Sequence, residues 1–308
     1  MDIKMKKYQY VSFWRAAACI GVFATHLGQR MQLEGSIKVI TDFGSNGVLV
    51  FFILTGFLAA DSRVIRDNKI LYWKKRAVKI LPLYIAILFF YFGIQLVQTR
   101  DLRTAIQYVM TDNVGGTWTL HTFILFYLIM PFIANIVNSY KRAWIFCFVT
   151  FMLRAVLILF DWGSVLSPFR HLYFCAMGVV LWHAIKEKKE CSMIFAALAI
   201  VILWLIQRSG DYYLIYSLLF MPMIFCTQSI SVKHGVIEKT VNLIDKYSYE
   251  IYLLQGVVCY LFVDGKQLGK MAVLVSMILG TVVTVLAVYW IIEKPFERIL
   301  QRRERMKE

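Results

Sequence analysis

Two basic side chains, Arg15 and His26, lie inside one apolar run from Val11 to Gly28. Because the eleven steps between them miss three full helical turns by only about 20°, both project from one face of a helix. An ionisable side chain in a membrane-length apolar segment is costly and by default indicates a site that faces the protein interior. A neutral imidazole there could take a proton from a hydroxyl group. The same pattern also fits a snorkelling arginine and a hydrogen-bonded packing histidine.

A second group of basic residues stands directly before an apolar run that begins near residue 80. It consists of Lys74, Lys75, Arg76 and Lys79, followed by Pro82 and Tyr84. Arg76 and Lys79 are three residues apart and would share one helical face. Such a concentration of cations at the mouth of a membrane span could hold a polyphosphate. It could equally attract anionic lipid headgroups.

The composition sets the class of protein. Of the 308 residues, 59% are hydrophobic and only 17% are charged, which is typical of a polytopic helical membrane protein and leaves no room for an ordinary soluble domain. The net charge of +15 would suggest nucleic acid in a soluble protein, but here the basic residues concentrate in short segments between apolar runs, where they fix topology. We therefore expect membrane lipids and no nucleic acid as partners. The six cysteines have no zinc spacing, and no metal site is predicted.

The apolar runs predict an all-α fold, a bundle of about ten transmembrane helices. The expected spans are 10–29, 43–60, 80–98, 118–138, 143–160, 169–185, 192–207, 212–230, 247–263 and 271–292. If the N-terminus is drawn in the cytosol, most of the 34 Lys and Arg residues fall in cytosolic segments such as 61–79. Such a bias supports this drawing, in which both termini are cytosolic. Arg30 is counted with the external loops and their edges. No internal repeat is visible, so we expect a single membrane domain over 1–308 with a basic cytosolic tail at 298–308.

Six short stretches occur in order along nearly the whole chain. They are Arg15 with His26, Gly47-Val48 to Thr55-Gly56-Phe57, the basic cluster running into Leu81-Pro82-Leu83-Tyr84, Trp118-Thr119-Leu120 to Phe126-Tyr127-Leu128 and Pro131, Tyr247-Ser248-Tyr249-Glu250-Ile251-Tyr252-Leu253, and Ile292-Glu293-Lys294-Pro295-Phe296. In these stretches the chain resembles the acyltransferase 3 family of integral-membrane acyltransferases. Each stretch alone is a loose match, and their order together with the topology makes the resemblance specific.

The resemblance implies a multi-pass enzyme of the plasma membrane, such as a bacterial inner membrane. Such an enzyme takes an acyl group, usually acetyl, from cytosolic acyl-CoA and transfers it to a hydroxyl of an envelope carbohydrate such as exopolysaccharide, capsule or lipid-linked glycan. His26 would be the catalytic residue and Arg15 an essential partner. Arg76 and Lys79 stand where the family has an Arg-x-x-Arg pair associated with acyl-CoA. Lys79 departs from that pattern, because lysine lacks the bidentate guanidinium fork.

Two further departures concern Phe123, where many members have Glu, and Gln255, where many have His. They leave the acyl-CoA assignment in place and the acceptor open. We expect Lys74, Lys75 and Tyr84 to belong to the acyl-CoA site with Arg76 and Lys79, because they stand beside the mouth of the same span. His26 would act either as a general base or through an acyl-histidine intermediate, and the sequence does not separate the two.

A transporter or flippase for an envelope glycolipid is the alternative function, because it too would combine many spans, basic cytosolic loops and intramembrane charges. The absence of a half-and-half repeat favours the enzyme. Arg154 and Glu250 also lie within apolar runs, and we expect structural pairing for both.

Overall fold

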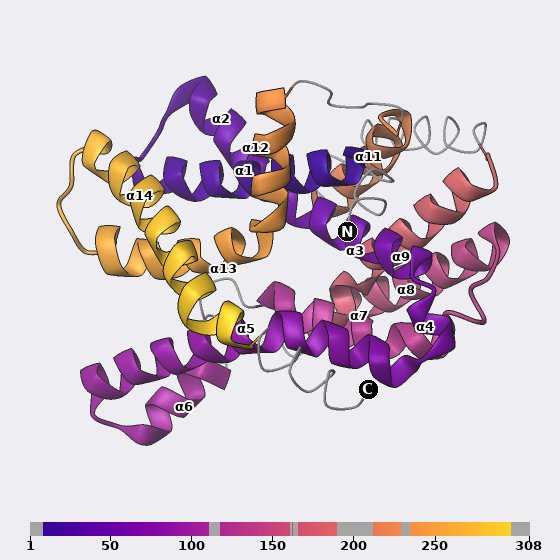
Figure 1. The fold of residues 1–308 in the computed structure, drawn as a ribbon, viewed down its shortest axis with the longest axis horizontal. Helices are drawn as coiled ribbons and strands as arrows, with labels where there is room; N and C mark the ends of the chain where they lie inside the picture. Colours follow the sequence, from indigo (N-terminus) through magenta and orange to yellow (C-terminus); the bar gives the residue numbers. More distant parts are fainter. Residues whose placement is uncertain are drawn as a thin grey trace. The chain divides into compact units, whose positions relative to one another are not determined.

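The computed structural model describes residues 9–110, 118–160, 162, 166–189, 212–228 and 235–296. Within these ranges every regular element is a helix, as Figure 1 shows. The all-α prediction is therefore confirmed for the described part of the chain.

Helices lie on the predicted spans wherever the structure describes them. They are α1 (Gln9–Arg30), α3 (Gly47–Asp61), α5 (Lys69–Thr99), α7 (Trp118–Ile133), α8 (Tyr140–Leu159), α9 (Ser167–Lys186), α11 (Tyr212–Cys226), α13 (Ser248–Val258) with the π-helical turn η3 (Cys259–Val263), and α14 (Lys270–Val288) with the π-helical turn η4 (Tyr289–Glu293). Short helices connect them, namely α2 (Gly35–Phe43), η2 (Gly44–Asn46), α4 (Val64–Asp67), α6 (Leu102–Met110) and α12 (Gly235–Lys246). The predicted span 192–207 lies outside the described residues.

Four of the described helical segments are long and apolar enough to cross a membrane: Gly35–Asp61, Lys69–Thr99, Tyr140–Leu159 and Lys270–Phe296. Three shorter apolar helices, Trp118–Ile133, Tyr216–Cys226 and Ser248–Val263, accompany them. These helices support a membrane protein, whereas the ten crossings and the cytosolic termini stay predictions. The four segments do not include α1, which carries Arg15 and His26 among its apolar residues.

The basic segment before the third predicted span is helical from Lys69 onward, so the helix begins well before residue 80, where the span was predicted to start. After the single turn of α4, helix α5 begins at Lys69, and the side chain of Asn68 accepts a hydrogen bond from the Leu71 amide at 2.8 Å. Asparagine is a strong N-cap, and the stretch that follows has neither glycine nor proline until Pro82, which lies inside the helix. The charged residues of this stretch are compatible with the helix, because Lys and Arg are good helix formers.

The chain divides into two compact units, and the division falls inside both α1 and α5. The first unit contains residues 1–22, 43–73 and 119–246, and the second contains residues 23–42, 74–118 and 247–308.

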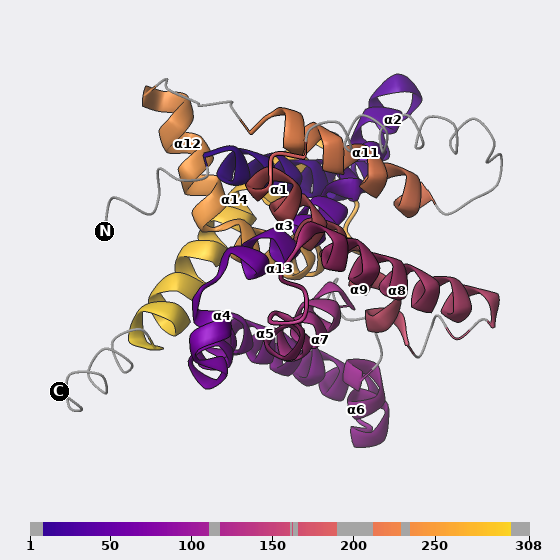
Figure 2. The ribbon, with the colours of Figure 1, turned by 90° about the vertical axis from the view of Figure 1, so that its right-hand side faces the viewer.

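In the first unit α3 and α8 both pack on α9, and Figure 2 shows α8 and α9 lying along one another. A side chain at Gly56 would meet the backbone oxygen of Cys175, and one at Gly178 would meet the backbone of Ile53. Glycine thus permits the close approach of α3 and α9.

Arg154 is one of the fully buried side chains of the first unit. Its guanidinium donates to the backbone oxygen of Arg170 at 3.0 Å and lies over the Phe174 ring, 4.9 Å from the ring centre. Glu250 belongs to the second unit, where its carboxyl group lies close to the carboxyl group of Glu293 and to the ammonium group of Lys79. The structure thus gives each of these charged groups partners within its own unit.

In the second unit α5 and α13 run side by side in the same direction. The Tyr249 hydroxyl donates to the backbone oxygen of Ile80 at 2.8 Å, and eleven residues further along each helix the rings of Tyr91 and Tyr260 meet edge to face, with centres 6.0 Å apart. Helix α14 returns along α13, as the contact of the Tyr247 and Tyr289 rings at 6.1 Å shows. These directions agree with those predicted for the third, ninth and tenth spans.

The end of α1 packs on this pair of helices. Its apolar residues Phe23 and Leu27, with Met31 just beyond the helix, cover a buried cluster from α13, η3 and α14 that consists of Val258, Cys259, Val263, Val273 and Met277. This packing fixes the last two turns of α1 within the second unit.

Candidate active site

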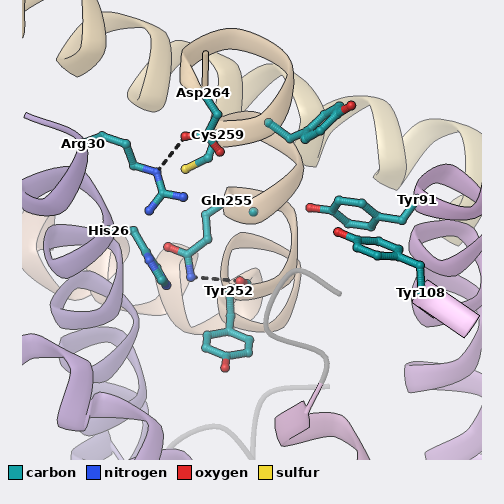
Figure 3. Close-up of a pocket in the computed structure, with 10 residues that line it drawn as sticks. His26, Arg30, Tyr91, Tyr108, Tyr252, Gln255, Cys259 and Asp264 are labelled. Atoms are coloured by element: carbon teal, nitrogen blue, oxygen red, sulfur yellow. Dashed lines mark hydrogen bonds and ion pairs between the residues drawn. The ribbon is translucent and has the colours of Figure 1, made fainter. Parts of the chain in front are cut away.

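The second unit contains a cavity of about 330 Å³, shown in Figure 3. Its wall is formed by side chains from α1, α5, α6, α13 and η3 and from the turn after η3. The lining residues are His26, Arg30, Tyr91, Tyr108, Tyr252, Gln255, Gly256, Cys259, Tyr260 and Asp264. The wall is rich in hydroxyl, amide and charged groups, which suits a ligand with several polar groups.

His26 lies at this cavity, half-buried, in the penultimate turn of α1. Its neighbour Thr25 donates to the backbone oxygen of Thr41 at 2.6 Å, and a side chain at Gly28 would meet the Thr41 hydroxyl. The end of α1 is therefore held against α2 as well as against α13 and α14. Because the helix is anchored around it, the imidazole is presented to the cavity from a rigid element.

Arg30 follows His26 by one helical turn and lines the same cavity. Its Nε atom lies 3.3 Å from Oδ1 of Asp264, the residue that follows η3. The sequence analysis counted Arg30 only at the external edge of the first span, and the structure adds that α1 continues to Arg30 and that this residue lines the cavity. The i, i+4 spacing of His26 and Arg30 was the sequence signal for this arrangement.

Gln255 brings a buried acceptor oxygen to the cavity. The side-chain nitrogen donates to the backbone oxygen of Tyr252 at 2.9 Å, while Oε1 is buried and has no hydrogen-bond partner in the described part of the chain. Figure 3 shows this side chain on the same side of the cavity as His26 and Arg30. A buried acceptor without a partner is costly, so the site is ready to receive a donor such as a ligand hydroxyl.

Tyrosines form the opposite wall. Tyr91 of α5 and Tyr108 of α6 point into the cavity with their hydroxyl groups close together in Figure 3. Tyr260 is fixed by the Tyr91 ring and by Gln98, whose side-chain nitrogen donates to the Tyr260 hydroxyl at 2.7 Å. Aromatic faces with polar edges are well suited to a sugar ring, which has apolar C–H faces and hydroxyl edges.

Arg15 is placed elsewhere. Its Nη1 atom lies 3.1 Å from Oδ1 of Asp245 on α12, within the first unit, and it does not appear in the described lining of the cavity. The structure thus gives Arg15 an ion pair that joins α1 to α12. Its predicted part in the reaction stays a prediction.

The basic cluster lies on the first turns of α5, in the same unit as the cavity. Lys74, Lys75 and Lys79 are exposed, while Arg76 and Tyr84 are half-buried. The continuous helix confirms that Arg76 and Lys79 are one turn apart. Along α5 the twelve residues from Lys79 to Tyr91 correspond to about 18 Å, so one helix connects the cluster to the cavity wall.

A family model described as an acyltransferase domain matches residues 8–293. The chain belongs to the acyltransferase 3 family. The resemblance noted in the sequence is thereby confirmed, and with it the presence of an acyltransferase domain. This domain comprises all the helices described above and extends over both compact units.

Two curated proteins are similar to parts of the acyltransferase domain. The protein named acyltransferase MdmB, from Streptomyces mycarofaciens, is 37% identical over 73 residues, which are 22% of this chain and 19% of that protein. Nodulation protein 10 from Rhizobium leguminosarum bv. viciae is 27% identical over 163 residues, which are 41% of this chain and 44% of that protein. The chain therefore matches less than half the length of either relative. No solved structure matches it.

Within the acyltransferase domain, sequence reasoning found His26 but missed most of its surroundings. Asp264 follows an apolar run and looked like an ordinary loop residue, and Tyr91 and Tyr108 are two of the chain's 17 tyrosines. Gln255 was noticed only as a departure from the family pattern. No spacing within the sequence connects α1 to α13, so only the fold brings these residues to His26.

Proposed function

We propose that this protein is a membrane acyltransferase that moves an acyl group, most simply acetyl, from acyl-CoA to a hydroxyl of a cell-envelope carbohydrate. The observation that carries the proposal is the position of His26 on a polar cavity within a chain of the acyltransferase 3 family. The printed name of the relative acyltransferase MdmB supports the reaction class.

In this proposal His26 is the general base. The imidazole takes the proton of the acceptor hydroxyl while the oxygen attacks the thioester carbonyl, and the protonated imidazole then returns the proton to the departing CoA thiolate. Gln255 accepts a hydrogen bond from a hydroxyl of the acceptor, and the tyrosine wall formed by Tyr91, Tyr108 and Tyr260 holds the sugar ring.

The donor is assigned to the basic cluster of α5. The phosphates of acyl-CoA would pair with Arg76, Lys79 and the exposed Lys74 and Lys75, with Tyr84 one turn further along. The flexible arm of CoA would then follow α5 toward the cavity. Both the cluster and the cavity lie in the second unit, which supports this assignment.

The test uses purified wild-type protein in detergent with acetyl-CoA and a panel of methyl glycosides as hydroxyl acceptors. Release of CoA thiol that depends on an acceptor, with an acetylated glycoside detected by mass spectrometry, is the expected result. If acetyl-CoA persists while a fluorescent glycolipid crosses the membrane of proteoliposomes containing the protein, the function is transport and the proposal is wrong.

A further inference from the structure

Arg30 is the permanently charged cation among the described residues that line the cavity. It stands one turn beyond His26 on α1, so the two side chains share a face of the helix. Figure 3 shows the guanidinium beside His26, with Nε turned toward Asp264. The cavity therefore combines a possible base and a set of strong hydrogen-bond donors on one rigid element.

Asp264 holds the guanidinium through one atom only. The 3.3 Å contact joins Nε of Arg30 to Oδ1 of Asp264 as an ion pair without the geometry of a hydrogen bond, and no hydrogen bond engages any guanidinium nitrogen of Arg30 in the described part of the chain. The Asp264 amide donates to the backbone oxygen of Cys259 at 2.8 Å, which closes the last turn of η3 and fixes the backbone that carries the carboxylate. The ion pair keeps the guanidinium at the cavity wall, and its terminal N–H groups are available to a ligand.

The ion pair also balances the charge around His26. The Asp264 carboxylate lies 3.3 Å from the Nε atom of Arg30, so a negative charge stands directly beside the positive one. In the resting state the cation and the carboxylate offset each other, so the cavity has donors without a large excess of positive charge. Such a site suits a negative charge that develops only during the reaction better than it suits a substrate with a permanent charge.

We infer that Arg30 is the oxyanion-stabilising residue of the proposed reaction and that Asp264 is its positioning residue; this inference rests on the proposed function. As the acceptor oxygen bonds to the thioester carbon, its proton passes to His26, and the carbonyl π electrons move onto the carbonyl oxygen. The terminal N–H groups of Arg30 donate to that oxyanion. The oxyanion then re-forms the carbonyl, the carbon–sulfur bond breaks, and the CoA thiolate takes the proton back from His26.

Substitutions of Arg30 separate this role from substrate binding. With acetyl-CoA and the best methyl glycoside of the panel, Arg30→Gln should lower kcat roughly 100-fold or more and leave both KM values within a few-fold, because the lost hydrogen bonds form only in the transition state. Arg30→Lys should retain more activity than Arg30→Gln. Asp264→Asn should lower kcat less than Arg30→Gln, since the donors remain but are less well oriented. Arg103→Gln, which removes an exposed arginine of α6, should leave kcat unchanged.

Chemical rescue distinguishes a part in the reaction from a purely structural role of Arg30, because a free guanidinium compound can replace only the former. In Arg30→Ala, added methylguanidinium should restore part of kcat, whereas it should restore nothing in His26→Ala, and the melting temperature of Arg30→Ala should stay within a few degrees of wild type. A raised acceptor KM at unchanged kcat in Arg30→Gln would overturn the oxyanion role, and so would a lack of rescue in a folded Arg30→Ala protein. In either case acetyl transfer by the wild-type protein would still uphold the proposed function. If the wild-type protein transfers no acetyl group, both fall.

Discussion

At the scale of single residues, the cavity is defined by polar atoms that apolar helices bring to one place. Gln255 is 3% exposed and holds an acceptor oxygen without a partner among the described residues, although its sequence context, Tyr252 to Gly256, reads as an ordinary membrane helix. Burial of such an atom costs free energy, and a ligand hydroxyl would recover it. Its position between the protein core and the cavity is the structural reason to assign it to the acceptor.

Replacement of this amide tests that assignment. Gln255→Leu keeps the size of the side chain and should raise the KM for the acceptor glycoside about tenfold, because a hydrogen bond to a neutral group contributes about 1 kcal/mol and the loss also weakens orientation. The KM for acetyl-CoA should hardly change. Gln107→Leu, on the exposed face of α6, is the matched control. Equal acceptor KM values for the two variants would remove Gln255 from the site.

His26 could be predicted from the sequence because its cost inside an apolar run does not depend on the rest of the fold. Arg30 and Asp264 could not, because a charge at the end of a span has an ordinary explanation in topology. Their pairing depends on η3 and on the turn after it, and it joins residues more than two hundred positions apart. Arg15 shows the opposite case, since its spacing from His26 suggested a shared site and the structure pairs it with Asp245.

At the scale of elements, α5 combines two roles, because its first turns carry the basic cluster and its middle lines the cavity. If the cluster binds CoA phosphates, Arg76→Gln should raise the KM for acetyl-CoA roughly tenfold or more, the loss of about 1.5–3 kcal/mol expected for a hydrogen bond to a charged group. Arg63→Gln, which removes an exposed charge just before α4, should change it little. Lys79→Arg should preserve or improve binding. Equal KM changes for the first two variants would mean that the segment contributes only a diffuse field.

The contact of α3 with α9 depends on glycine. Gly56→Ala would place a methyl group against the backbone oxygen of Cys175, which a helix backbone cannot easily avoid, so the variant should unfold more readily by about 1–3 kcal/mol. Gly93→Ala on α5 is the control, because a side chain there meets open space and alanine favours helix by about 1 kcal/mol. Thermal melting in detergent should rank Gly93→Ala above or equal to wild type and Gly56→Ala below it. The reverse order would contradict the packing described for the first unit.

The helices could be predicted from the sequence better than the contacts between them. The spans were predicted by apolar length, and helices occupy each of them that the structure describes. The third span was predicted to start at residue 80, whereas α5 begins at Lys69, because apolar length does not register a charged stretch in which Lys, Arg and Leu favour helix and Asn68 supplies a cap. The parallel course of α5 and α13 could be anticipated only from the predicted topology, since the contacts that establish it, such as Tyr249 with Ile80, are invisible in the sequence.

At the scale of the whole molecule, the predicted orientation places both termini in the cytosol. Single cysteines at Lys38 and Arg103, both exposed, should react with an impermeant thiol reagent added outside intact cells, and a cysteine at Arg63 should not. The background needs Cys191→Ser and Cys226→Ser, because Cys226 is exposed and Cys191 lies outside the described residues, whereas Cys19, Cys147, Cys175 and Cys259 are buried. Labelling at Arg63 from outside would refute the orientation.

The most direct test of the central claim is the acyl-transfer rate of His26→Ala beside that of His121→Ala. Both variants remove a half-buried imidazole from a helix, but only His26 lines the cavity in the second unit. With acetyl-CoA and the best methyl glycoside, we expect His26→Ala to lose transfer by a factor of about 100 to 10,000, the contribution of a general base, while its melting temperature stays near that of wild type. His121→Ala should transfer acetyl at close to the wild-type rate. Wild-type transfer by a folded His26→Ala protein would contradict the account.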